Sequence, residues 1–154
     1  MPQTTLTAID PLLDGYDALP HFDRTAHPNV DWQATPLEKF HPEQPFDYIF
    51  CLNVINHVRD LGASLRVLAQ ALSPNGKLVL SVDAHRRGWL LPIFRAVPGD
   101  ILHPHQLDLA QYEAACRAVG LRLTAKQRYA REAIFDYWVL TLEPARARGS
   151  DTER

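Results

Sequence analysis

The densest group of ionisable side chains in this sequence is a histidine pair, His103 and His105, which flank Pro104 and follow Asp100. Imidazole groups can contact a substrate, accept a proton from it, or bind a metal ion. A metal site needs further ligands at a recognisable spacing, and no firm third ligand is visible near this pair. The histidine pair therefore contacts a substrate, binds a metal ion or belongs to a polar loop. Of these three possibilities, we do not predict the metal site.

A second group of candidates follows the most apolar run of the chain, which ends at residues 51–54. Open α/β sheets bind their ligands at the carboxyl ends of strands, so this turn is a candidate ligand site. Asn53 and Asn56 need hydrogen-bond partners in such surroundings, and they either contact a ligand or cap the next helix. His57 either acts as a base or makes ordinary structural contacts at the start of that helix.

The elements that must position these residues can be predicted from apolar spacing. Residues 46–54 and 77–83 are typical of strands buried on both faces of a parallel sheet. Between them, Leu61, Leu65, Leu68 and Leu72 form one stripe of a helix that begins after Asp60 and ends at the turn of residues 73–76. A strand, a helix and a second strand form a right-handed βαβ unit.

The flanking segments add shorter elements. We expect strands at residues 6–9 and 29–35, with one short helix between them. A helix capped by Asp108 and stopped by Gly120 precedes two strands, 121–126 and 134–142, which are close enough to form an antiparallel hairpin. The fold class is therefore α/β, a doubly wound and mostly parallel sheet with a C-terminal antiparallel hairpin.

Composition limits the classes of function. The chain has 154 residues and a formal net charge of -2, which disfavours nucleic acid as a partner. It has no run of about 20 apolar residues and no signal peptide, so we expect a cytoplasmic protein without a membrane partner. The cysteines, Cys51 and Cys116, are expected to be buried free thiols. One domain is expected over residues 1–143, followed by a flexible tail over 144–154.

A basic and aromatic patch follows the strand that ends at residue 83, and it contains Arg86, Arg87, Trp89 and Arg95. It is a lid over an anionic or aromatic substrate, a solvated connection, or, with the apolar residues 89–94, a cover for the sheet or the face of a homodimer.

The stretch Phe46–Asp83, FDYIFCLNVINHVRDLGASLRVLAQALSPNGKLVLSVD, resembles the fourth strand, following helix and fifth strand of class I S-adenosylmethionine-dependent methyltransferases. The segment DLAQYEAACRAVGLRL and the strand pair after it resemble the last helix and closing hairpin of that family, and TAIDP resembles its second strand. The resemblance covers about residues 6–143 and implies a Rossmann-like fold, with S-adenosylmethionine as the cofactor.

The resemblance also implies roles for individual residues. Asp10 would receive the ribose hydroxyls, although Asp-Pro is also an ordinary start of a turn. Thr35 would lie near the adenine amino group and Leu37 would flank the ring. The residues that would lie beside the methionine part of the cofactor are Cys51, Asn53 and Val54. The ionisable groups that would lie nearest to the transferred methyl group are His57, His103 and His105.

The sequence departs from the family at one point. The family's first strand and its glycine-rich turn have no counterpart, because no two of the seven glycines lie within three residues of each other. The fold is thus expected to be N-terminally truncated. We expect the strand that ends at Asp10 to pair directly with the strand 46–54; the alternatives are that residues 1–45 pack elsewhere or that another chain supplies the missing strand.

Two functions follow from these observations. The first is an S-adenosylmethionine-dependent methyltransferase-like protein that acts on a small-molecule acceptor and is incomplete or inactive alone. Methyl transfer depends mostly on positioning, so the lack of an obvious catalytic triad does not count against it. The alternative is a methyltransferase-derived interaction or dimerisation module without catalysis.

Overall fold

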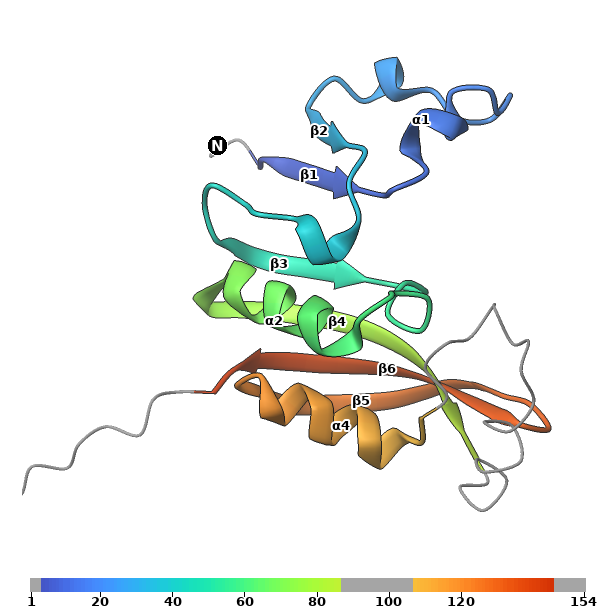
Figure 1. Cartoon of the computed structure of the whole chain (residues 1–154), viewed down its shortest axis with the longest axis vertical. Coiled ribbons are helices and arrows are strands. Elements are labelled where there is room, and N and C mark those ends of the chain that lie inside the picture. Colours follow the sequence, from blue (N-terminus) through green and yellow to red (C-terminus); the bar gives the residue numbers. More distant parts are fainter. Residues whose placement is uncertain (1–3, 87–106, 146–154) are drawn as a thin grey trace, which may run out of the picture. The chain divides into compact units, whose positions relative to one another are not determined.

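The computed structural model describes residues 4–86 and 107–145, and the chain divides into two compact units, Met1–His41 and Pro42–Arg154 (Figure 1). The predictions that concern His103 and His105, and most of those on the basic patch and the tail, lie outside the described residues. The prediction of one domain over residues 1–143 remains a prediction.

The first unit is built on two short strands that pair in parallel, β1 (Leu6–Ile9) and β2 (Val30–Gln33). A single-turn helix, α1 (Leu13–Tyr16), and a 3-10 helix, η1 (Arg24–Ala26), lie between them in the chain. The strands expected near residues 6–9 and 29–35 are confirmed, and a second 3-10 helix, η2 (Leu37–Lys39), follows β2.

The second unit is a four-stranded sheet in the order β3-β4-β6-β5. Its strands are β3 (Phe46–Cys51), β4 (Leu72–His85), β5 (Leu121–Arg131) and β6 (Phe135–Pro144). β3 and β4 are parallel neighbours, whereas β6 is antiparallel to both β4 and β5. The predicted βαβ unit and the C-terminal antiparallel hairpin are therefore confirmed, and this sheet is mixed.

Two helices complete this unit, and both begin at a capping aspartate. The Oδ1 atom of Asp60 accepts a hydrogen bond from the Ala63 amide at 2.9 Å at the start of α2 (Leu61–Ala71). At α4 (Leu109–Ala118), Asp108 and Gln111 form a reciprocal capping box, which satisfies two amides that the helix leaves unpaired. The chain leaves α4 at Gly120, whose φ of 81° is accessible to glycine at little cost.

The core lies between the sheet and these helices, which cover the same face of the sheet (Figure 1). Leu65 and Leu68 of α2 and Tyr112 and Cys116 of α4 are buried, as their spacing predicts. On the sheet, alternate residues of β4 and β6 are fully buried, namely Leu78, Leu80, Val82, Leu140 and Leu142. Both cysteines are free and buried, as expected.

The expectation that the 46–54 strand is buried on both faces is wrong. Tyr48 and Phe50 are 62% and 66% exposed, while Cys51, which points to the opposite face, is 5% exposed. Among the described residues of this unit, both helices lie on one side of the sheet, and neither covers the face that carries Tyr48 and Phe50. The strand also ends early, because Asn53 has a φ of 56° and breaks the extended backbone.

The expectation that the first strand pairs with the strand 46–54 is also wrong. β1 pairs with β2, with Leu6 opposite Val30 and Ile9 opposite Gln33, and β3 pairs with β4. Strands that follow one another in the chain commonly pair, and β2 is the next strand after β1.

The turn predicted at residues 73–76 lies inside β4, which begins at Leu72. Phe46 is opposite Leu72 and Tyr48 is opposite Lys77, so the extra residues of β4 are accommodated by an irregularity in the pairing. The residues that were predicted to form a turn before the strand therefore form the first part of the strand itself.

Candidate functional site

The turn after β3 is held by a buried hydroxyl on the neighbouring strand. The Asn53 amide donates a hydrogen bond to the Oγ atom of Ser81 at 2.7 Å. Ser81 is 7% exposed and lies in the middle of β4. Because this contact joins residues 28 positions apart, it ties the left-handed backbone at Asn53 to the rigid part of the sheet.

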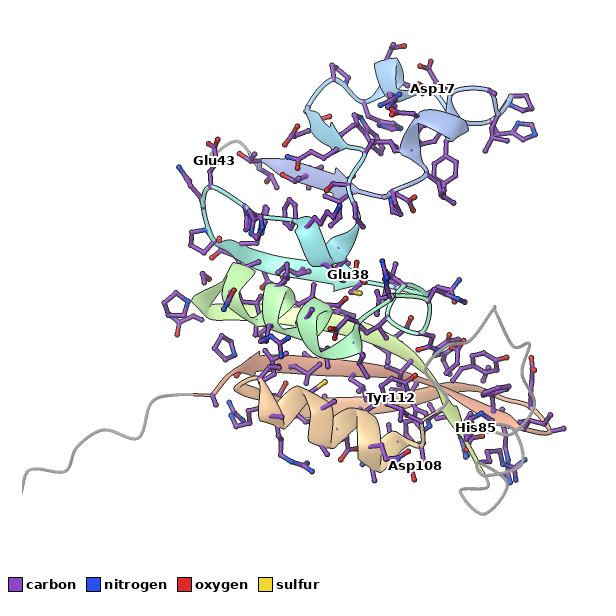
Figure 2. The ribbon with its side chains drawn as sticks, viewed as in Figure 1. Asp17, Glu38, Glu43, His85, Asp108 and Tyr112 are labelled. Carbon is purple, nitrogen blue, oxygen red and sulfur yellow. The ribbon has the colours of Figure 1, made fainter. Side chains whose placement is uncertain are left out.

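A second contact ties the same turn to α4. Asn56 is 3% exposed; its Oδ1 atom accepts a hydrogen bond from the Tyr112 hydroxyl at 3.2 Å, and its Nδ2 atom donates to the Asp83 carbonyl oxygen at 3.5 Å. Burial raises the pKa of Tyr112, and the negative charge of Asp83 raises it further, so the hydroxyl stays protonated and can donate. Tyr112, labelled in Figure 2, thereby joins α4 to this turn.

The structure excludes one of the two roles predicted for the asparagines, that of a helix cap. The cap of α2 is Asp60, so neither Asn53 nor Asn56 caps that helix. Asn56 serves as a buried link between three elements, whereas the Asn53 side chain is exposed at the carboxyl end of β3. The turn therefore exposes the amide side chain of Asn53, while buried hydrogen bonds to Ser81 and from Asn56 hold its backbone in place.

The other predicted residues of this turn differ in exposure. Leu52 and Val54 are 51% and 39% exposed, so they offer apolar surface on either side of Asn53. The thiol of Cys51 is buried, and burial raises its pKa to about 12, which leaves it protonated and weakly nucleophilic. Only the backbone of Cys51 can take part in binding without a rearrangement.

His57 is exposed on the same turn, and its amide donates a hydrogen bond to the Val54 carbonyl oxygen at 2.9 Å. The structure thus brings His57 and residues 51–54 together, as their nearness in the sequence requires. His103 and His105 lie outside the described residues, and their relation to this turn stays a prediction.

Two residues of this second unit were not identified from the sequence as site residues. Ser81 supports the turn, and the signal that could have found it is the single polar residue of the apolar run LVLSV, residues 78–82. His85, which is labelled in Figure 2, is 5% exposed at the carboxyl end of β4 and packs on Phe135 with 4.4 Å between ring centroids. No spacing in the sequence singles it out.

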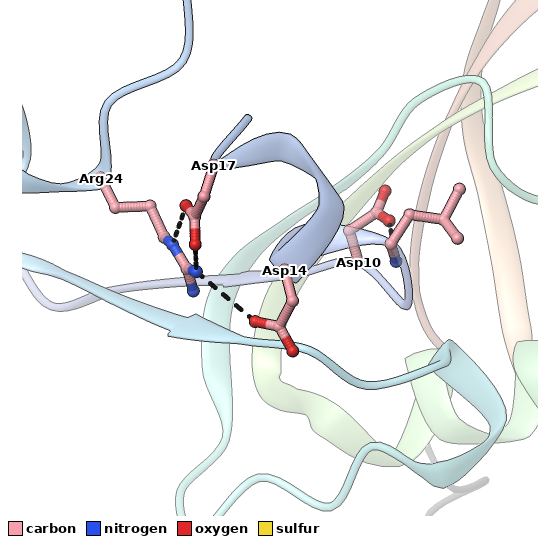
Figure 3. A network of polar contacts seen from close by, with 5 residues as sticks. Asp10, Asp14, Asp17 and Arg24 are labelled. Atoms are coloured by element: carbon pink, nitrogen blue, oxygen red, sulfur yellow. Dashed lines mark hydrogen bonds and ion pairs between the residues drawn. The ribbon is translucent and has the colours of Figure 1, made fainter. Parts of the chain in front are cut away.

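The predicted adenosine-binding residues belong to the first unit. The Oδ1 atom of Asp10 accepts a hydrogen bond from the Leu12 amide at 2.7 Å, so this carboxylate starts the turn after β1 (Figure 3). Thr35 is half-buried and its amide donates to the Gln33 carbonyl oxygen at 2.9 Å, whereas Leu37 is 8% exposed. The turn-forming role of Asp10 is therefore present, and its second carboxylate oxygen is not required for that role.

An arginine beside this turn joins α1 to η1. Arg24 donates hydrogen bonds to both carboxylate oxygens of Asp17 and contacts Asp14 at 3.4 Å (Figure 3). The hydrogen bonds from Arg24 hold the pKa of Asp17 below its ordinary value. This ion pair is exposed, so its contribution to stability is small, but its titration reports whether the loop is ordered.

We expect the Arg24→Gln variant to raise the pKa of Asp17 toward its ordinary value, as measured by NMR titration of the side-chain carboxyl. Because the folded-state pKa is the lower one, the pair stabilises the fold above the unfolded-state pKa of about 4 and loses this effect as the pH falls through the folded value. Asp23 is the internal control, since the hydrogen bonds from Thr25 lower its pKa in the variant as well. An Asp17 pKa that the substitution leaves unchanged would show that the loop does not adopt this conformation.

Two further findings concern other kinds of site. The described ranges, 4–86 and 107–145, contain no group of three or more histidine, cysteine or acidic side chains placed to hold a metal ion. None of the helices in those ranges is both long and apolar enough to cross a membrane.

A parallel βαβ unit with an anchored turn at the carboxyl end of its first strand defines an α/β protein of the Rossmann-like, ligand-binding kind. Comparison with known families makes this specific: residues 2–78, half of the chain, match the methyltransferase domain family. The chain therefore belongs to this family, the class I methyltransferases, whose cofactor is S-adenosylmethionine. The predicted family and fold class are confirmed.

The relatives differ from this chain in length. A ubiquinone biosynthesis O-methyltransferase of Rhodopseudomonas palustris strain HaA2 is 27% identical over 133 residues, which are 80% of this chain and 51% of the relative. A counterpart from Bradyrhizobium sp. strain ORS 278 is 30% identical over 76 residues, 49% of this chain and 30% of the relative. The chain thus spans about a third to a half of the length of these relatives.

Solved structures agree on the fold. An S-adenosylmethionine-dependent methyltransferase from Clostridium acetobutylicum has a TM-score of 0.68 at 9% identity, covering 92% of this chain and 76% of its own. The 1,6-didemethyltoxoflavin-N1-methyltransferase of Burkholderia thailandensis, with bound 1,6-didemethyltoxoflavin and S-adenosylhomocysteine, has a TM-score of 0.65 at 19% identity, covering 92% and 61%.

Proposed function

We propose that this chain binds S-adenosylmethionine at the turn after β3 and transfers its methyl group to a small-molecule acceptor. Membership of the methyltransferase domain family supports the reaction class. The name of the relatives, O-methyltransferases of ubiquinone biosynthesis, supports an oxygen atom as the acceptor. The same family membership favours this function over an interaction module without catalysis.

The observation that carries the proposal is the anchoring of this turn. Its residues fit the methionine part of the cofactor because Asn53 exposes an amide beside the apolar side chains of Leu52 and Val54. Ser81 and Asn56 hold the turn from the buried side, so binding would not have to order it. The bound cofactor supplies an electrophilic methyl group; the turn contributes position rather than acid–base chemistry.

The remaining site residues are part of the proposal. Asp10, Thr35 and Leu37 are assigned to the adenosine part, as the resemblance implies. His57, His103 and His105 are assigned to proton acceptance from the acceptor, which an oxygen nucleophile needs if it must lose its proton. The chain has no glycine-rich turn, so we expect its affinity for the cofactor to be lower than that of a site which has one.

Calorimetric titration with S-adenosylhomocysteine tests this proposal, together with two serine variants. We expect measurable heat with the unchanged protein and affinity about three to ten times lower in Ser81→Ala, because the Asn53 amide loses its partner. Ser64→Ala is the matched control: Ser64 is also buried, but among the described residues its hydroxyl has no hydrogen-bond partner.

The outcomes separate clearly. Equal affinity for S-adenosylhomocysteine in all three proteins would show that the cofactor does not bind at the turn after β3. A complete lack of heat, together with an unchanged melting temperature, would show that this chain does not bind the cofactor. A loss of affinity in Ser64→Ala equal to that in Ser81→Ala would show that the effect reports packing and not the turn.

A further inference from the structure

Three arginines of the second unit approach one carboxylate, that of Asp136 in β6. Its Oδ2 atom accepts a hydrogen bond from Nη1 of Arg128 at 3.4 Å. The Nε atoms of Arg86 and Arg131 lie 3.7 and 4.0 Å from its Oδ1 atom. We call Arg86, Arg128 and Arg131 the arginine cluster. Arg86 also belongs to the basic patch of the sequence and is the residue of that patch that the structure describes.

The arginine cluster holds more positive charge than its surroundings neutralise. Within residues 4–86 and 107–145, Asp136 is the one acid at ion-pair distance from these three arginines. The carboxylate of Glu132, directly after β5, instead accepts a hydrogen bond from the Tyr137 hydroxyl at 3.1 Å. Three guanidinium groups around one carboxylate repel one another, because they are closer together than the Debye length of about 10 Å at 0.1 M salt. An anion bound among them would relieve this repulsion.

The cluster also has hydrogen-bonding capacity that Asp136 does not use. Arg131 approaches it only at 4.0 Å, which is beyond hydrogen-bond distance. The Oδ1 atom of Asp136 is buried and accepts no hydrogen bond within the described part of the chain. The carboxylate therefore lacks the paired, parallel hydrogen bonds that a guanidinium can make to it. The side chains of Arg128 and Arg131 are 43% and 56% exposed, so a ligand can reach their N–H donors.

The fold does not need three arginines to attach the hairpin of β5 and β6 to the sheet. Backbone pairing joins β6 to both β4 and β5. Arg86 adds two contacts, from its amide to the Ile134 carbonyl oxygen at 2.9 Å and from Nη1 to the Glu132 carbonyl oxygen at 3.0 Å. Arg128 lies over the Trp138 ring, with 5.8 Å from its guanidinium carbon to the ring centroid. This contact orients the guanidinium before a ligand arrives, which lowers the cost of binding.

The arginine cluster lies at the same edge of the sheet as the turn after β3 (Figure 1). Because β3 and β4 are parallel and β6 is antiparallel to β4 and β5, the ends of β3, β4 and β5 and the start of β6 meet at this edge. Asn56 of the turn donates to the Asp83 carbonyl oxygen, and Asp83 is three residues before Arg86. Three residues of a strand span about 10 Å, a distance that one small molecule can bridge.

We propose that the arginine cluster binds an oxyanion group, a carboxylate or a phosphate, of the small-molecule acceptor. Guanidinium groups match both oxyanions because they donate paired N–H···O hydrogen bonds in a fixed geometry. The assignment of this ligand as the methyl acceptor rests on the proposed function. The inference adds that the acceptor is anionic, and that its charged group lies on the side away from the atom that receives the methyl group.

NMR titration of the backbone amide signals tests the anion site with three ligands that share a benzene ring: benzoate, phenyl phosphate and neutral benzamide. We expect saturable shifts at residues 128–131 and 135–138 with at least one anion, with a dissociation constant on the order of millimolar, and none with benzamide. Added sodium chloride should weaken the binding, because it screens the charges. The anion that binds more tightly identifies the charged group as a carboxylate or a phosphate.

Arg131→Gln is the main variant, because this arginine makes the longest contact to Asp136. We expect it to weaken binding of the preferred anion about three- to tenfold. The matched control is Arg122→Gln, which removes the same charge from a similarly exposed arginine of β5 (57% against 56%) that pairs with Glu143 instead. This control should bind like the unchanged protein. Asp136→Asn removes the neutralising charge and should tighten binding, and circular dichroism melting confirms that each variant is folded.

The outcomes separate this inference from the proposed function. Equal shifts with benzamide and the anions, no shift with either anion, or an equal loss in Arg122→Gln and Arg131→Gln would each overturn the inference. Binding of S-adenosylhomocysteine without binding of either anion would overturn the inference alone. Anion binding at the cluster without any binding of S-adenosylhomocysteine would support the oxyanion site and contradict the proposed methyl transfer.

Discussion

Replacement of Tyr112 by alanine is expected to lower the free energy of unfolding by about 3–5 kcal/mol, which is comparable with the whole stability of many small domains. Tyr112 is fully buried in α4, where its ring fills the layer between that helix and the sheet. Removal of the ring leaves a cavity that the surrounding core can only partly close. Urea denaturation followed by tryptophan fluorescence measures this loss.

Tyr112→Phe separates the hydroxyl from the ring. It keeps the packing but leaves the Oδ1 atom of the buried Asn56 without the hydrogen bond from the Tyr112 hydroxyl, at an expected cost of about 1–3 kcal/mol. A double-mutant cycle with Asn56→Ala isolates the pair, and the two effects should be clearly less than additive. Tyr129→Phe, at an exposed tyrosine, is the control and should change stability by less than about 0.5 kcal/mol. Additive effects of Tyr112→Phe and Asn56→Ala would show that this hydrogen bond is absent.

Gly76→Ala is the second substitution with a large expected effect. A Cβ atom at Gly76 would lie 2.8 Å from the Phe46 carbonyl oxygen and 3.1 Å from the Ser73 amide nitrogen. Both are backbone atoms at the irregular start of the β3–β4 pairing, so neither can move without disturbing the sheet. We expect a loss of about 1–3 kcal/mol in the free energy of unfolding, measured by urea denaturation.

Gly62→Ala is the matched control for this prediction. A Cβ atom at Gly62 would meet only side-chain atoms of Asp60 and Arg66, at 3.5 Å, and the residue lies in the first turn of α2. Alanine is a better helix former than glycine, so this variant should be more stable by up to about 1 kcal/mol. If both variants are equally stable, the close approach of β4 to Phe46 does not occur in solution.

Local sequence signals predicted most elements of the second unit correctly. The aspartates before α2 and α4, the leucine spacing of α2 and the glycine after α4 act within a few residues of their own positions. The same holds for the strand pair at the C-terminus, which is joined by a short connection. Such signals depend on backbone geometry nearby and are therefore readable without the tertiary structure.

Long-range pairing was less predictable. The apolar run 46–54 has the composition of a strand buried on both faces, yet nothing in it states which neighbours cover each face, and Tyr48 and Phe50 are exposed. The partner of the first strand was predicted wrongly for the same reason, since no local signal states which strand lies beside β1, and its partner is β2. In the site, the sequence indicated the turn of residues 51–57 but not Ser81, which contacts Asn53 across 28 residues.

By itself, the amino-acid sequence determined the α/β class, the βαβ unit, the Asp108 cap of α4 and the family to which this chain belongs. Only the tertiary structure decided that Asn56 links the turn to α4 and β4 and that Asp60, rather than either asparagine, caps α2. The physical reason is the distance along the chain between the residues that interact. Caps and periodicity involve residues a few positions apart, whereas a buried hydrogen bond between distant residues depends on which segments the fold brings together.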